Sequence, residues 1–246
     1  MGETGILSEP CGGNKPRGGA RLGATHEARK RALAMKLYTY FRSSASYRVR
    51  IALALKGLAH ESVFVNLPKA EHQGGEYRAV NPQALVPSLE DGGHVLIQSL
   101  AIMEYLDEAY PEPPILPSAP LDRAYVRAVS QIVACEIHPL NNLRTLKHIR
   151  ATYKLDDDGV NAWYRHWIAA GLGSLESYLA AAGRVGRYAF GEIVTIADCC
   201  LVPQIFNAKR FDCDLAPYPT VMGVFDQCMK LAAFESTQPA KQGDAV

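Results

Sequence analysis

A proline-rich segment divides the chain into two parts. Residues 111–120, "PEPPILPSAP", contain five prolines. Proline has no backbone N–H and its ring clashes with the preceding turn of a helix, so this segment neither continues a helix nor crosses the middle of a sheet. We therefore expect a semi-rigid linker between two units, each with its own hydrophobic pattern.

The residues before this linker alternate between strand and helix patterns. A strand, a helix and a strand within about thirty residues form a right-handed βαβ unit with parallel strands. A hairpin signal and a further helix follow. In order, the sequence predicts a strand over 36–41, a helix over 43–57, a strand over 61–67, a hairpin around Asp91-Gly92-Gly93 and a helix over 99–111.

The residues after the linker have a helical pattern throughout. From Tyr125 to Ile137, apolar residues recur at i, i+4, i+7 and i+8, which places them on one helical face. No strand pattern interrupts the helices that follow, which are predicted over 160–182, 195–211 and 219–235. The predicted fold class is therefore α/β plus all-α, with one unit over 35–114 and the other over 115–240.

The first 34 residues differ from the rest of the chain. They are rich in glycine, lack apolar periodicity and carry six Lys/Arg against three Glu. They contain no apolar region of the kind found in a secretory signal. We expect residues 1–34 to be a disordered or non-native extension, with Met35 as the functional start.

Charge and cysteine content exclude several classes of protein. The formal net charge of +1 gives no basic surface for nucleic acid or for an anionic membrane, and no apolar run is long enough to cross a bilayer. Six cysteines lack metal-ligand spacing and are too sparse for a disulfide framework, so we expect no metal and a cytoplasmic location. Cys135, Cys199 and Cys200 fall within helical patterns and are expected to be small buried hydrophobes.

Two of the predicted helices begin with hydroxyl side chains. Ser43 and Ser44 precede one helix, and Gln98 and Ser99 stand where a strand gives way to another. Such residues cap the free N–H groups of a first helical turn. A helix start of this kind can also hold an anion, because its N–H groups and its dipole favour negative charge. The residues alone leave both functions open.

Val86 and Pro87 stand before a predicted strand. The proline is either an ordinary strand-start residue or part of a cis-proline turn. In the second case the backbone N–H and C=O of Val86 are free to pair with a peptide-like ligand. Together with two helix starts, this turn would complement a short, anionic, peptide-like ligand.

Several polar and aromatic residues of the helical unit have structural explanations. Thr195 and Asp198 fit the capping box that begins many helices. Residues 156–158, three aspartates, are expected to form a solvated loop, because no calcium-binding spacing follows them. Trp163 and Trp167 are expected to pack in the core or between domains.

Two cationic or titratable residues of the same unit stay ambiguous. His138 is followed by Pro139, and it is either a packing residue or a polar group that faces a cleft between the domains. Arg210 lies near a helix end, where it would favour the C-terminal dipole. Spacing alone does not assign either of them to a ligand.

Six segments between Met35 and about Pro239 carry a family resemblance: "SSASYRVRIALALKG", "NPQALVPSL", "IQSLAIMEYLDE", "IHPLNNLR", "TIADCCLVPQ" and "RFDCDLAPYPT". With these segments the chain resembles a zeta-class glutathione transferase. The resemblance implies a thioredoxin-like domain over 35–114, an all-helical substrate domain over 115–240, glutathione as cofactor and a homodimer. The implied reaction converts maleylacetoacetate to fumarylacetoacetate in tyrosine and phenylalanine catabolism.

The resemblance also implies roles for twelve residues. Ser43, with Ser44 beside it, would activate the glutathione thiol, while Arg42 and Arg210 would hold the dicarboxylate substrate. Ala45 departs from the family, since many members carry cysteine or threonine there. The remaining residues would bind glutathione: Val86 and Pro87 its cysteinyl backbone, Gln98 and Ser99 its γ-glutamyl end, His72 its glycyl carboxylate, and His138, Asn142 and Arg144 the same pocket from the helical domain.

Rotation about a carbon–carbon double bond requires that bond to be broken for a time. In the implied mechanism the glutathione thiolate adds to the double bond, the resulting single bond rotates and the thiolate then leaves.

Three other functions are alternatives to the isomerisation of maleylacetoacetate. They are a maleylpyruvate isomerase of gentisate degradation, a general zeta-class transferase and a non-catalytic binding protein. The joint presence of Ser43, Val86, Pro87, Gln98 and Ser99 weighs against the last of these.

Overall fold

The computed structural model describes residues 35–245. The extension predicted over residues 1–34 lies outside this range. Within the described residues, no helix combines the length and the apolar character needed to cross a membrane.

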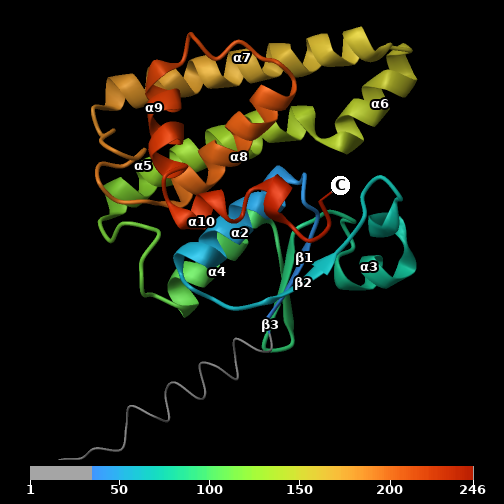
Figure 1. Ribbon diagram of the computed structural model, residues 1–246, viewed down its shortest axis with the longest axis horizontal. Helices are drawn as coiled ribbons and strands as arrows, with labels where there is room; N and C mark the ends of the chain where they lie inside the picture. The colour runs from blue at the N-terminus through green and yellow to red at the C-terminus, as the bar shows by residue number, and fades with distance from the viewer. Residues whose placement is uncertain (1–34, 246) are drawn as a thin grey trace, which may run out of the picture.

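A four-stranded mixed sheet forms the base of the first unit, with strand order β2-β1-β3-β4 (Figure 1). The first two strands are parallel and the last two form a hairpin, which confirms the predicted βαβ unit and the predicted turn. β1 and β3 pair antiparallel. The strands are β1 (Lys36–Thr39), β2 (Glu61–Phe64), β3 (Ser88–Asp91) and β4 (His94–Ile97).

Two helices cover the face of the sheet that looks toward the helical unit. These are α2 (Ser44–Leu55), the crossover between β1 and β2, and α4 (Ser99–Ala109). A short helix, α3 (Gly75–Val80), lies on the opposite side of the sheet in Figure 1, after the 3₁₀ turn η1 (Glu71–Gln73). The sequence analysis did not predict α3, because six residues are too few to show a helical period.

The second unit is helical, as predicted, and its core is continuous with that of the first. Buried side chains run from Leu37 on β1 through Leu201 to Phe234 without a break. The boundary near residue 114 therefore remains a prediction. The elements are α5 (Pro120–Gln131), η2 (Ile132–Ile137), η3 (His138–Asn141), α6 (Leu143–Tyr153), α7 (Asp157–Ala182), α8 (Ile196–Arg210), α9 (Pro219–Cys228), α10 (Ala232–Glu235) and η4 (Pro239–Lys241).

A π-helical segment interrupts the helix that begins at α5. In η2 the hydrogen bonds span five residues instead of four, which changes the helical face on which each later side chain lies. Cys135 is therefore exposed, and the prediction that it would be a buried hydrophobe is wrong; Cys199 and Cys200 are buried as expected. The segment ends directly before His138, so it also sets the direction of that side chain.

Aspartates fix the starts of two helices of the second unit, α7 and α8. The predicted capping box at Thr195 and Asp198 is present, and the Asp198 carboxylate accepts hydrogen bonds from the N–H groups of Ala189 and Thr195, both at 2.8 Å. Burial raises the pKa of Asp198 to about 6, against the lowering effect of these hydrogen bonds. The prediction of a solvated loop over 156–158 is wrong. Asp156 caps α7 by accepting a hydrogen bond from the N–H of Gly159 at 2.9 Å. The next two aspartates occupy the first helical turn, where the helix dipole favours negative charge.

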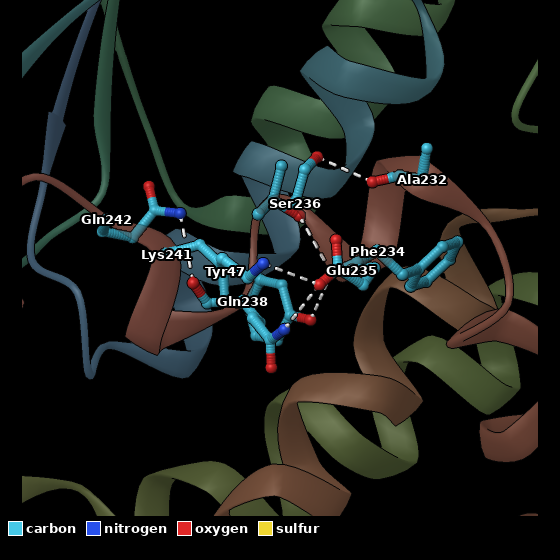
Figure 2. Close-up of polar contacts among 9 residues, drawn as sticks. Tyr47, Ala232, Phe234, Glu235, Ser236, Gln238, Lys241 and Gln242 are labelled. Atoms are coloured by element: carbon cyan, nitrogen blue, oxygen red, sulfur yellow. Dashed lines mark hydrogen bonds and ion pairs between the residues drawn. The ribbon is translucent and has the colours of Figure 1, made fainter.

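The C-terminal segment returns to the first unit and lies against α2 (Figure 2). The hydroxyl of Tyr47 donates to the carbonyl of Phe234 at 2.8 Å, and Nε of Arg50 donates to the carbonyl of Thr237 at 3.1 Å. Further along, the Asp244 carboxylate accepts from the N–H of Phe41 at 3.0 Å. The segment thus holds the turn between β1 and α2 in place.

We predict opposite effects for alanine at two glycines of α7. A Cβ at Gly171 would overlap Cγ1 and Cδ1 of Ile137 in the π segment, whereas a Cβ at Gly173 would meet no heavy atom within 4 Å. Gly171→Ala should lower the free energy of unfolding by about 1 to 3 kcal/mol through overpacking. Gly173→Ala, the matched control, should raise it by about 0.5 to 1 kcal/mol. Urea unfolding measures both, and equal effects of the two variants would contradict the packing described for η2.

Candidate active site

One cavity collects most of the predicted site residues. It has a volume of about 380 Å³ and lies between the β1–α2 turn, the loop before β3 and the helical segments η3, α6 and α8. Pro87 adjoins it, while Gln98 and Ser99 lie beyond its wall. Nine of the twelve predicted residues line it: Arg42, Ser43, Ser44, His72, Val86, His138, Asn142, Arg144 and Arg210.

The two serines at the start of α2 have different environments. Ser43 is the N-cap, and its Oγ accepts a hydrogen bond from the N–H of Ser46 at 3.2 Å. Ser44 is buried in the first turn, where its Oγ accepts a hydrogen bond from Nδ2 of Asn207 on α8. A hydroxyl has one donor besides its acceptor sites, so each serine can accept these bonds and still donate to a ligand. Capping and anion binding are therefore compatible at Ser43.

The peptide bond between Val86 and Pro87 is cis, as one of the two sequence alternatives predicted. Val86 is buried and lines the cavity directly before β3. Among residues 35–245, the N–H and C=O of Val86 take part in no hydrogen bond. This backbone can therefore pair with an extended peptide that enters the cavity.

The start of α4 lies just beyond the cavity wall. Gln98 has a positive φ of 71° and its Nε2 donates to Oε1 of Gln83, a residue of the cavity lining, at 2.8 Å. Ser99 is buried at the first position of α4, and its Oγ accepts from Nη1 of Arg48 at 3.2 Å. Gln83 therefore connects the cavity lining to the start of α4.

The cavity is electropositive. Its lining contains the cations Arg42, Arg144, Lys147 and Arg210, and none of its described residues is a carboxylate. Such a surface binds dianions, because each carboxylate can form charge-assisted hydrogen bonds with a guanidinium or an ammonium group.

The two histidines of the cavity add no positive charge at neutral pH. Burial lowers the pKa of His138 to about 3, and the neighbouring charges of Arg48 and Arg144 lower it further. Burial also lowers the pKa of His72, as does the charge of Lys147. Both side chains are therefore neutral hydrogen-bonding groups at pH 7.

Several lining residues were missed by the sequence analysis. Asn207 lies three positions before Arg210 on α8, and Lys147 lies three positions after Arg144 on α6, so helical spacing could have found both. Tyr164 on α7 gives no such signal, because it lies far from the other site residues in the sequence. The missed polar residues are Tyr40, Gln73, Gln83, Asn141, Lys147, Tyr164 and Asn207.

Comparisons with known proteins show what this chain is similar to. Residues 33–108 match the family model for the N-terminal domain of glutathione S-transferase. The maleylpyruvate isomerase of a Ralstonia species is 48% identical over 211 residues, which cover 86% of this chain and 100% of that protein. A holo structure of maleyl pyruvate isomerase, described as a bacterial glutathione S-transferase of the zeta class, matches with a TM-score of 0.84 at 48% identity and covers 86% of this chain and 100% of its own.

The chain belongs to the zeta class of glutathione transferases.

A further match is a solved structure with ligands in its active site. This structure of maleylacetoacetate isomerase from Anaeromyxobacter dehalogenans contains dicarboxyethyl glutathione and citrate. It is 41% identical to the present transferase, with a TM-score of 0.77, and the match covers 87% of this chain and 98% of that one.

We predict that a small dianion stabilises this transferase through the cavity cations. Malonate at ten times its dissociation constant should raise the free energy of unfolding by about 1.4 kcal/mol, and the effect should shrink in 1 M NaCl. Thermal unfolding with increasing malonate measures this, with the uncharged malonamide as control. Equal stabilisation by malonamide would show that charge is not what the cavity recognises.

Proposed function

We propose that this zeta-class transferase is a glutathione-dependent isomerase that converts maleylacetoacetate to fumarylacetoacetate. The observation that carries the proposal is one cavity that combines two serine hydroxyls at a helix start, a free backbone edge at Val86 and four cations without a carboxylate. Glutathione is an anionic tripeptide with a thiol, and the substrate is a dianion. Together the two ligands need each of these three features.

The glutathione contacts in this proposal are those that the family resemblance implies. The Val86 backbone, before the cis peptide bond to Pro87, pairs with the cysteinyl residue and brings its sulfur toward the start of α2. The γ-glutamyl end extends toward Gln98 and Ser99 at the start of α4. His72, which lines the cavity, binds the glycyl carboxylate. From the helical unit the glutathione contacts are His138, Asn142 and Arg144.

Activation of the thiol is the first chemical task. A free thiol has a pKa of about 8.5, so only a few per cent is ionised at neutral pH. The Ser43 hydroxyl donates a hydrogen bond to the sulfur, with Ser44 beside it, and the dipole of α2 adds positive potential. Each effect favours the thiolate and lowers the pKa of the bound thiol.

The thiolate then acts as a nucleophile that the cofactor supplies. Its sulfur adds to one carbon of the cis double bond, and the electron pair moves onto the conjugated carbonyl as an enolate. Rotation about the new single bond follows, and collapse of the enolate expels the thiolate and leaves the trans product. Arg42 and Arg210 hold the carboxylates and stabilise the enolate charge as it forms. The dicarboxyethyl glutathione in the Anaeromyxobacter structure carries a carbon–sulfur bond of the kind that such an addition forms.

Maleylpyruvate is the second candidate substrate. The Ralstonia relative is named for it, and both acids present a maleyl double bond beside a carboxylate. A general zeta-class transferase would use the same thiolate but would need a less cationic second pocket.

We also propose that the enzyme is a cytoplasmic homodimer, as the resemblance implies.

Removal of the Ser43 hydroxyl should raise the pKa of bound glutathione and reduce turnover. Ser43→Gly is the sharper variant, because glycine caps a helix almost as well as serine, whereas Ser43→Ala also costs about 1 kcal/mol of stability. We expect kcat/KM to fall by about 100-fold or more in both variants. Thiolate absorbance against pH and steady-state rates measure the two effects. An unchanged thiol pKa with near-normal turnover would remove Ser43 from the mechanism.

Arg210→Gln should raise the KM of the dicarboxylate by about tenfold or more, because a hydrogen bond to a charged group contributes about 1.5 to 3 kcal/mol. The dissociation constant of glutathione should change by less than about twofold. Lys209→Gln is the matched control, since Lys209 lies over the ring of Phe225 at 4.0 Å and does not line the cavity. If Arg210→Gln weakened glutathione and substrate equally, Arg210 would not be the substrate cation.

A further inference from the structure

Arg48 on α2 is a buried cation whose donors are largely unused. Only 2% of the residue is exposed. Nη1 donates to Oγ of Ser99 at 3.2 Å, while Nε and Nη2 are buried and have no hydrogen-bond partner among residues 35–245. Within the same residues no carboxylate forms an ion pair with Arg48.

This arrangement is unfavourable for folding. A buried guanidinium without a countercharge carries a desolvation cost that its attraction to neighbours does not offset. Burial accordingly lowers the pKa of Arg48.

A second arginine on the same helix shows that the fold can satisfy such a group. Arg50 is equally buried, but it donates to the carbonyls of Thr237, Tyr40 and Phe41 and to the Thr39 hydroxyl. The unmatched charge of Arg48 is therefore a local feature and not a general consequence of burying arginine on α2.

The position of Arg48 links its charge to the α4 start. Its one hydrogen bond goes to Ser99, whose N–H begins α4, and the N–H groups of a first helical turn attract an anion. Because the Ser99 oxygen accepts from Arg48, the hydroxyl proton of Ser99 is directed away from the guanidinium and is available to donate. On the other side, the charge of Arg48 helps to keep His138 neutral.

We propose that Arg48 is a positioning residue for the γ-glutamyl carboxylate of glutathione, which it serves by orienting Ser99 and by adding positive charge behind the α4 start. This inference rests on the proposed function, because it requires glutathione as the ligand. Arg48 does not touch the ligand, since its nitrogen atoms are shielded, and so it differs from Arg42 and Arg210, which line the cavity. The carboxylate of the bound cofactor supplies the negative charge that the chain itself does not place beside Arg48.

The test compares glutathione with 4-aminobutyryl-cysteinylglycine, which is glutathione without its γ-glutamyl carboxylate. Calorimetric titration of both peptides into wild type and Arg48→Met isolates the part of binding that needs the carboxylate. We expect Arg48→Met to weaken glutathione binding at least tenfold and to change analogue binding by less than twofold. Its melting temperature should equal or exceed that of the wild type, because the variant removes an unmatched buried charge.

Three further variants make the result specific. Arg48→Lys should recover part of the preference for glutathione over the analogue. Ser99→Ala should lose much of the same preference, and the double variant Ser99→Ala/Arg48→Met should lose less than the sum of the two single variants, since Arg48 acts in part through Ser99. Arg50→Met, the matched control on α2, should lower the melting temperature and should not discriminate between the two peptides.

The inference is overturned if Arg48→Met weakens both peptides equally or weakens neither. If Arg48→Met does not fold, Ser99→Ala still tests the inference. An unchanged preference of Ser99→Ala for glutathione over the analogue would contradict the proposed action of Arg48 through Ser99. If the wild type failed to bind either peptide, the proposed function itself would fall and this inference with it. If the wild type bound both peptides normally and the variants kept the preference for glutathione, only the role proposed for Arg48 would be overturned.

Discussion

Helix α2 is packed between the sheet and α8, and this packing fixes where its first turn points. Most of its residues from Ser44 to Leu53 are buried, because β1 and α4 cover one side, α8 covers another and the C-terminal segment lies across it. A helix held on so many sides keeps the Ser43 cap and the Ser44 hydroxyl at constant positions. The C-terminal contacts of Tyr47 and Arg50 hold the turn before the helix as well. The proposed activation of the glutathione thiol depends on these positions, since a hydrogen bond to sulfur requires a fixed donor.

Charge decides what this cavity can bind. Four exposed cations and the absence of a carboxylate among its described lining residues favour dianions, while neutral histidines supply hydrogen bonds without further charge. Arg48 adds a buried positive charge near the α4 start, outside the lining. In the proposed function Arg42 and Arg210 hold the substrate, and Arg144 contacts glutathione. Arg48 then serves the cofactor from behind the α4 start. Such a division lets cofactor and substrate be recognised by separate groups in one cavity.

Much of this could be predicted from the sequence, because strand and helix periods and the proline segment are local signals. The βαβ unit, the hairpin and the capping box follow from residues close together in the chain. The residues around Pro87 leave a cis-proline turn and an ordinary strand start open, and the structure has the cis bond. Other features depend on contacts that no local pattern encodes. The π segment changes the exposure of Cys135, the cap at Asp156 replaces an expected loop, and Tyr164 enters the cavity from a distant helix. The unmatched charge of Arg48 is visible only when its surroundings are known.

The central claim is that the nucleophile belongs to glutathione. The most direct measurement is the steady-state rate at which the enzyme isomerises maleylacetoacetate and maleylpyruvate with glutathione, without it, and with S-methylglutathione, which fills the cavity but has no thiol. We expect turnover of at least one acid with glutathione, no turnover without it, and inhibition by S-methylglutathione. Equal turnover in the absence of glutathione would contradict the account.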